Sequence, residues 1–255
     1  MRILGARFCS PLLPPITTRL SKTFDKYLPV TPALHSSATP VISTRDLTRL
    51  PDILTLRRLT RSLSMLDAIL SPDWEARYYS FNSRWAESAM MASMRNGEGD
   101  EWHAIFCKGG GALQGIVVDA PVRRDRPVLD VFEGLPAEFQ QSLLREPAFE
   151  AERSTFCIWR LTRDECWSTG SVRLPPGDDP DGSAGLLSIL DGDPKSYIVW
   201  ANEYYGRDLP EADVAAVYRH EPLTAELVSR LNPEVDLGSL AGDVAEIGFP
   251  EDAAR

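Results

Sequence analysis

The sequence predicts an α+β protein built on an antiparallel β-sheet, a meander plus a hairpin, and three observations support this fold class. An amphipathic helical period comes first, short β-prone runs separated by glycine-rich turns follow, and a series of short helices that begin near prolines completes the chain. Strands grouped before helices are typical of α+β proteins, in which helices cover one face or one end of the sheet. The chain has 255 residues, 43% of them hydrophobic, which is enough for one sizeable core. We therefore expect a leader over residues 1–45, one domain over 46–250 and a tail over 251–255.

The first predicted helix covers residues 52–70. Leucine and isoleucine side chains recur there at three- and four-residue steps, with arginines between them, which is the amphipathic helical pattern. Ser71 and Pro72 end this helix, because proline cannot continue the hydrogen-bond ladder. Aromatic residues that partly alternate with Glu75 and Arg77 then predict a strand over residues 74–81.

Three β-prone runs follow, at residues 90–94, 102–106 and 113–118. The turns between them, RNGEGD and KGGG, contain the glycines that tight hairpins require, so we expect an antiparallel meander. Residues 135–144 then predict a helix, and residues 155–161 with 166–172 predict a second strand pair.

Beyond Pro180 the pattern changes to five short helices. Pro194, Pro210, Pro222 and Pro233 each fall near a predicted helix start, where a missing N–H costs nothing. The predicted ranges are 184–190, 195–205, 211–219, 225–231 and 237–247.

Charge is distributed unevenly along the chain and bears on the class of partner. Residues 1–65 hold ten Arg/Lys and three Asp/Glu, whereas residues 66–255 hold 17 and 34. Residues 66–255 therefore lack the basic face that nucleic-acid binding requires, and their negative charge attracts basic proteins. The acidity is also explained by solubility alone. No apolar run approaches the roughly 18 residues of a membrane span, so neither nucleic acid nor membrane is an expected partner.

The first 45 residues are basic, rich in Ser, Thr and Pro, and without a sustained hydrophobic period. These features predict a disordered leader, and an organellar targeting segment or a mis-set start in a GC-rich genome are the alternatives. The four cysteines show no C-x-x-C spacing, and no secretory signal is evident, so we expect a reducing, cytoplasmic location.

The acidic stretch PPGDDPDGSAGLLSILDGDP, residues 175–194, has two interpretations. The stretch does not match a calcium loop of the EF-hand type, which needs an acidic residue at position 1 and glutamate at position 12. With Gly182 at the sixth position, these two positions are Gly177 and Ser188. Helix capping fits instead: Asp181 or Ser183 begins a helix near Ala184, and Asp193 with Pro194 begins the next. The alternative is a divalent-metal site, which would use Asp178, Asp179 and Asp181.

Aromatic residues are densest in DWEARYYSFNSRW, residues 73–85. We expect most of these rings in the core and the polar residues among them at the edge of the sheet, where Trp, Tyr and Arg favour protein binding. The residues predicted to form this partner-binding edge are Arg77, Asn82, Arg84, Trp85 and Arg95.

Other candidate sites have simpler structural interpretations. His103 and Cys107 share a strand face but lie about 13 Å apart, too far for a catalytic dyad. His220 is expected as a cation at a helix end. The glycines after Lys108 precede a strand rather than a helix, so they predict a turn and no phosphate-binding loop. No catalytic residue and no cofactor is therefore expected.

Two resemblances accompany these observations. The segments SMLDAILSPDWEARYYSFNSRW, MASMRNGEGDEW, EPAFEAERSTFCIWR and DPDGSAGLLSILDGDPKSYIVWANEYY resemble those of a family of uncharacterised soluble bacterial proteins, from Ser64 to about Pro250. That family implies no activity and no catalytic residues. The segment GLPAEFQQSLL and the acidic α+β composition are loosely similar to SUKH-type immunity proteins, which neutralise toxins by binding them.

The function expected from the sequence is a non-catalytic cytosolic protein-binding module with a basic partner and a toxin-neutralising or regulatory role. The alternative is a metal-dependent hydrolase that uses the loop from Asp178 to Asp181. Nucleic-acid binding through the aromatic segment is opposed by the charge.

Overall fold

A computed structural model describes residues 41–123 and 130–251 of the protein. The helices and strands of the described residues, with 3-10 helices labelled η, are α1 (Ile53–Leu70), η1 (Trp74–Ala76), β1 (Tyr79–Ala86), β2 (Ala89–Arg95), β3 (Glu101–Cys107), β4 (Gly110–Ile116), η2 (Pro121–Arg123), α2 (Ala137–Arg145), η3 (Pro147–Phe149), η4 (Ala151–Arg153), β5 (Phe156–Leu161), β6 (Ser168–Thr169), α3 (Ser183–Leu187), η5 (Ser188–Asp191), α4 (Pro194–Tyr205), α5 (Glu211–Tyr218), α6 (Ala225–Leu231), η6 (Leu237–Leu240) and α7 (Ala241–Ile247).

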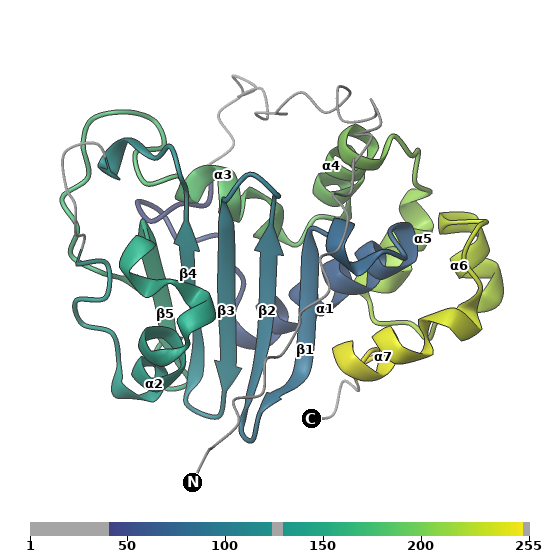
Figure 1. The fold of residues 1–255 in the computed structure, drawn as a ribbon, viewed down its shortest axis with the longest axis horizontal. Helices are drawn as coiled ribbons and strands as arrows, with labels where there is room; N and C mark the ends of the chain where they lie inside the picture. The colour runs from purple at the N-terminus through teal and green to yellow at the C-terminus, as the bar shows by residue number, and fades with distance from the viewer. Residues whose placement is uncertain (1–40, 124–129, 252–255) are drawn as a thin grey trace, which may run out of the picture. The chain divides into compact units, whose positions relative to one another are not determined.

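The predicted antiparallel meander and hairpin are present, and they join in one open sheet in sequence order, β1-β2-β3-β4-β5-β6. Figure 1 shows its first five strands side by side. A two-residue turn joins β3 to β4, since Cys107 pairs with Gly110. Gly110 has a φ of 146°, and a Cβ there would lie 2.2 Å from the carbonyl oxygen of Arg160 on β5. Only glycine fits this close approach, so the glycine run shapes the sheet, and no helix follows it.

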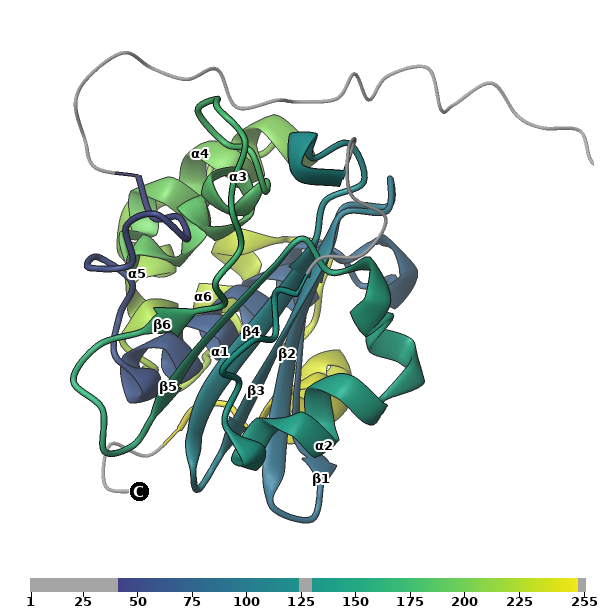
Figure 2. The ribbon, with the colours of Figure 1, turned by 90° about the vertical axis from the view of Figure 1, so that its left-hand side faces the viewer.

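Helices cover both faces of the sheet, unequally. Figure 2 shows α1 and the helices that follow β6 on one side of the strands and α2 on the other. The larger core lies on the α1 side, and a smaller one forms between α2 and the central strands, where Phe139 and Leu143 meet Ile105 and Trp159. The sheet is therefore a middle layer, with α2 as an addition to the predicted one-sided arrangement.

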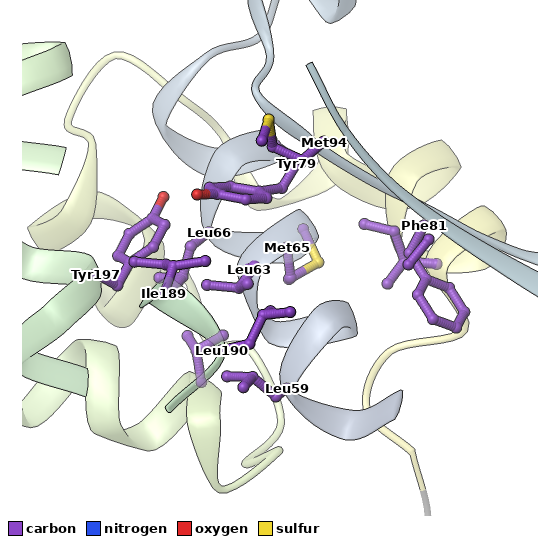
Figure 3. Packing of buried hydrophobic residues seen from close by; sticks show 14 of the residues in the cluster. Leu59, Leu63, Met65, Leu66, Tyr79, Phe81, Met94, Ile189, Leu190 and Tyr197 are labelled. Carbon is purple, nitrogen blue, oxygen red and sulfur yellow. The ribbon is translucent and has the colours of Figure 1, made fainter. Parts of the chain in front are cut away.

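Helix α1 is the centre of the larger core. Its Leu63, Met65 and Leu66 are fully buried. Figure 3 shows Leu63 and Leu66 near Tyr79 of the sheet and Tyr197 of α4, with Met65 on the side of Phe81. The predicted helical period is confirmed, and Asp52 caps the helix by accepting a hydrogen bond from the backbone N–H of Thr55.

Several predicted boundaries were wrong. Residues 74–76 form η1 instead of a strand, because Asp73 accepts the backbone N–H of Glu75 and starts a tight turn, and β1 begins at Tyr79. Strand β4 begins three residues earlier than predicted, since Gly110 and Gly111 pair with β5. The second strand of the last hairpin is only β6, and the helix predicted over residues 237–247 is divided into η6 and α7.

The ends of the described chain pack against the domain. Residues 1–40 of the predicted leader lie outside the described residues, but Ile42 is buried and Thr44 donates a backbone hydrogen bond to Ser183. Glu251, assigned from the sequence to the tail, forms ion pairs with Arg57 and Arg61. Within the described residues, no helix is long and apolar enough to cross a membrane.

Candidate functional site

Arg77, the first residue of the predicted partner-binding edge, is structural. Its side chain is buried, and its guanidinium group donates to the backbone oxygens of Ser71 and Pro72. The same group forms an ion pair with Asp243 of α7, with a shortest distance of 2.5 Å. Arg77 therefore fastens the end of α1 to α7 and presents no charge to a partner.

Asn82 and Arg84 lie beside α7, where each contacts the helix end. The amide nitrogen of Asn82 donates to Glu246, and the guanidinium of Arg84 donates to the backbone oxygen of Ala245. Trp85 lies apart from them, because it stacks on Phe149 with ring centroids 5.6 Å apart and packs against the smaller core. The five predicted residues therefore do not form one surface.

Arg95, the remaining predicted residue, has a specific role beside Trp74. Its guanidinium carbon lies 4.0 Å from the centroid of the Trp74 ring, a cation–π contact. The same side chain donates to the backbone oxygen of Trp74 at 2.7 Å, and its backbone N–H donates to Tyr78. Arg95 thus holds Trp74 in place while 53% of this large residue stays exposed.

Tyr78 connects this point to α4. Its ring centroid lies 4.8 Å from that of Tyr204 and 4.9 Å from that of Trp200. Trp200 and Tyr204, four residues apart on the helix, stack with an interplanar angle of 13°. We call Trp74, Tyr78, Trp200 and Tyr204 the aromatic surface. Trp74 is exposed and is joined to the others through Arg95 and the backbone of Tyr78, whereas the other three are half-buried. Val199, which is 61% exposed, lies beside Trp200 on α4.

Acidic residues flank the aromatic surface. Burial raises the pKa of Tyr78 above its ordinary value, and the neighbouring Tyr204, Glu98 and Asp100 add to the rise. Glu98 and Asp100 belong to the turn between β2 and β3, and Glu203 is exposed on α4. The aromatic rings therefore lie beside negative charge.

A buried carboxylate supports the aromatic surface from below. Asp67, fully buried on α1, accepts the backbone N–H groups of Tyr78 and Tyr79 at 2.9 and 2.8 Å, and the hydroxyl of Tyr197 at 2.7 Å. Burial raises the pKa of Asp67 to about 6, and these hydrogen bonds oppose the rise. Asp67 thus joins α1, the start of β1 and α4 behind the half-buried rings of Tyr78 and Trp200.

The aspartates of the acidic loop bind backbone amides at a helix start. Asp179 accepts the N–H groups of Ala184 and Gly185 at 2.9 and 2.8 Å. Asp181 accepts the N–H of Ser183 at 3.1 Å and also the hydroxyl of Thr44. The helix begins one residue earlier than expected, at Ser183, so the N-cap residue is Gly182 and not Asp181 or Ser183. Asp179 and Asp181 nevertheless accept the first N–H groups of the helix.

The remaining members of this loop have similar structural surroundings. The backbone oxygen of Asp178 accepts a hydrogen bond from Arg45, and Asp193 caps α4 through the N–H of Lys195 as predicted. Among residues 41–123 and 130–251, no three His, Cys, Asp or Glu side chains come together as a group that could hold a metal ion.

The histidines that the structure describes serve in packing and hydrogen bonding. His103 stacks on Phe149 with centroids 4.3 Å apart, and burial lowers its pKa to about 4. His220 is not the helix-end cation expected from the sequence: burial lowers its pKa, and its Nδ1 accepts the N–H of Glu251. The imidazole is therefore neutral, and its Nε2 carries the proton. His35 lies outside the described residues.

Two hollows in the described part of the chain are small. One of about 60 Å³ is lined in part by Thr155, Cys157 and Asp181, and another of about 20 Å³ lies beside Arg77 and Asp243. Drug-sized ligands occupy pockets of roughly 300 to 1,000 Å³. These two hollows hold a few water molecules at most, so the aromatic surface is the stronger candidate for function.

Two of the four residues of the aromatic surface, Trp74 and Tyr78, belong to the aromatic segment singled out in the sequence. Trp200 and Tyr204, which are four residues apart in VWANEYY, were not predicted. That spacing places two rings on one helix face and was the available signal. Comparison of the chain with family models, with curated proteins and with solved structures finds no match in any of the three.

Proposed function

We propose that this protein is a non-catalytic protein-binding module whose aromatic surface binds a basic protein, in a toxin-neutralising or regulatory role. One observation supports this most directly: Trp74 is 53% exposed, yet the guanidinium group of Arg95 holds its ring in place. Tryptophan, tyrosine and arginine are enriched among the residues that dominate protein interfaces.

Fixed rings favour binding because little conformational entropy remains to be lost. Immobilising a flexible side chain at an interface costs about 0.5–1.5 kcal/mol. Trp74 rests on a guanidinium group, and Trp200 and Tyr204 rest on each other. Most of this conformational entropy is therefore lost during folding and not during binding.

The charge of the protein favours a basic partner. Residues 66–255 hold 17 basic and 34 acidic residues, and Glu98 and Asp100 lie near Tyr78. Negative charge accelerates the encounter with a positive protein and weakens as salt screens it. We expect partner binding that decreases as the salt concentration rises.

Two of the three aspartates that a metal-dependent hydrolase would need, Asp179 and Asp181, accept hydrogen bonds from backbone amides at the start of α3. For this reason we propose protein binding in preference to metal-dependent hydrolysis. Micromolar binding of Mg²⁺, Mn²⁺ or Ca²⁺ in a calorimetric titration would reverse this preference.

A pull-down from cells of the source organism, with variants of the surface, tests the proposal. The wild-type protein should retain a basic protein that salt elutes, and Trp74→Ala should lose it. Leu144→Ala is the matched control, because Leu144 is a large apolar residue on α2 that is 40% exposed. Retention of only acidic proteins, or equal retention by Trp74→Ala, would contradict the proposal. A toxin gene beside this one would support the toxin-neutralising role.

A further inference from the structure

The last described residues, 249–251, lie across α1 and the end of α5. Glu251 forms ion pairs with Arg57 and Arg61 of α1, the latter at 2.6 Å, and its backbone oxygen accepts from Arg58 at 2.9 Å. Phe249 is buried, and its ring centroid lies 4.9 Å from that of His220. We call residues 249–251 the strap and Arg57, Arg58 and Arg61 the arginine cluster.

His220 is the residue that joins the strap to both helices. Its Nδ1 accepts the backbone N–H of Glu251 at 2.9 Å, so Nδ1 carries no proton. Its Nε2 lies 2.9 Å from the backbone oxygen of Arg58 and must therefore be the N–H donor there. Both contacts require one neutral tautomer of the imidazole.

The backbone at His220 is strained, which indicates that this side chain serves a purpose. His220 has a φ of 60°, and it follows α5 in a hydrogen-bond pattern that normally has glycine at this place. The pattern consists of the bonds from His220 N to Val217 O and from Glu221 N to Ala216 O. A side chain in the left-handed region is retained where its contacts offset the strain.

The arginine cluster has more positive charge than the strap neutralises. Arg57 and Arg61 share the one carboxylate of Glu251, whereas Arg58 contacts only its backbone oxygen; Arg61 is only 4% exposed. The Nε atoms of Arg57 and Arg61 are buried without a hydrogen-bond partner in the described part of the chain. The strap therefore covers a surface that would attract an anionic group if it were open.

We propose that the strap is a proton-sensitive cover, latched by His220, that conceals the arginine cluster when the imidazole is neutral and loosens when it is protonated. A proton on Nδ1 would point at the N–H of Glu251, so two donors would face each other across 2.9 Å. The hydrogen bond that holds the strap would then be lost.

The groups around His220 determine the sign of the pH effect. Burial, with the charges of Arg58 and Arg61, lowers the pKa of the imidazole, whereas Glu251 and the bond to the Arg58 carbonyl oppose this change. The pKa in the folded protein is therefore below the usual histidine value of about 6.5. The latch is complete above that value and is lost as the pH falls through the lower pKa of the folded state.

Hydrogen–deuterium exchange of the full chain, measured by NMR from pH 7.5 to pH 4, tests the latch. The protection factor of the Glu251 amide, corrected for intrinsic exchange at each pH, should fall about tenfold on acidification, as expected for one lost hydrogen bond. Amides in the middle of α1 should keep their protection over the same range.

Two variants separate the latch from a purely structural role of His220. His220→Gly suits the left-handed backbone, so a role of His220 in the backbone turn alone predicts unchanged or higher protection at Glu251. The latch predicts that His220→Gly loses protection at Glu251 at pH 7.5 and no longer responds to pH. His103→Gln, which changes a histidine on β3, should retain the wild-type response. A pH-independent Glu251 amide in the wild type, or a protected one in His220→Gly, would overturn the proposal.

Discussion

Replacing Asp67 with asparagine should remove a pH dependence of stability while the fold is retained. Asparagine has the same shape, and its oxygen can accept the backbone N–H groups of Tyr78 and Tyr79, as the carboxylate does. Its amide nitrogen can donate to the hydroxyl oxygen of Tyr197, which reverses one hydrogen bond without leaving it unmade. The variant therefore differs from the wild type mainly in the buried charge.

The size of the effect follows from the pKa of Asp67. Burial raises this pKa from 3.8 to about 6, so the folded protein holds a proton that the unfolded chain releases. Each pKa unit corresponds to about 1.4 kcal/mol, which gives a total of about 3 kcal/mol. Stability from this group is greatest below pH 3.8 and is lost as the pH rises through 6, because the buried charge is then formed.

Urea unfolding of both proteins measures this pH dependence of stability. The pH values should lie on either side of the isoelectric point of about 4.9. The free energy of unfolding of the wild type minus that of Asp67→Asn should fall by roughly 2 kcal/mol between pH 4.2 and pH 7. Taking the difference cancels the groups that titrate equally in both proteins. A difference that stays flat, or one that rises with pH, would refute the argument that burial outweighs the hydrogen bonds at this carboxylate.

Two further predictions concern the helix start and the hairpin. Asp179→Ala should destabilise the protein by about 1–2 kcal/mol in thermal or urea unfolding, because two helix-start amides lose their acceptor; Asp178→Ala, whose side chain makes no such bond to α3, is the control, and equal losses would argue against capping. Gly110→Ala should cost several kcal/mol, because its Cβ would lie 2.2 Å from the carbonyl oxygen of Arg160, whereas Gly97→Ala meets no atom within 4 Å and tests the cost of a positive φ alone. Similar losses in these two glycine variants would show that the close approach is unimportant.

Local patterns in the sequence were sufficient to predict the elements of the fold. The leucine period of α1, the glycines in the two turns from β2 to β4 and the aspartate cap at Asp193 each act within a few residues of the chain. Hydrogen bonds and turns of this kind depend on sequence neighbours, so they can be predicted from a single sequence. The failures at residues 74–76 and at β6 concern element ends, where a short turn competes with strand pairing.

The sequence by itself determined the fold class, the antiparallel meander and the helix cap at Asp193. Only the tertiary structure decided which charged side chains are buried: Arg77 between α1 and α7, Asp67 beneath the aromatic surface, and Glu251 beside the arginine cluster. These contacts join residues separated by up to 194 positions, as between Arg57 and Glu251. Partners so distant come together only when helices pack against a sheet, and burial then changes the charge and role of a side chain in ways that its own sequence neighbours do not encode.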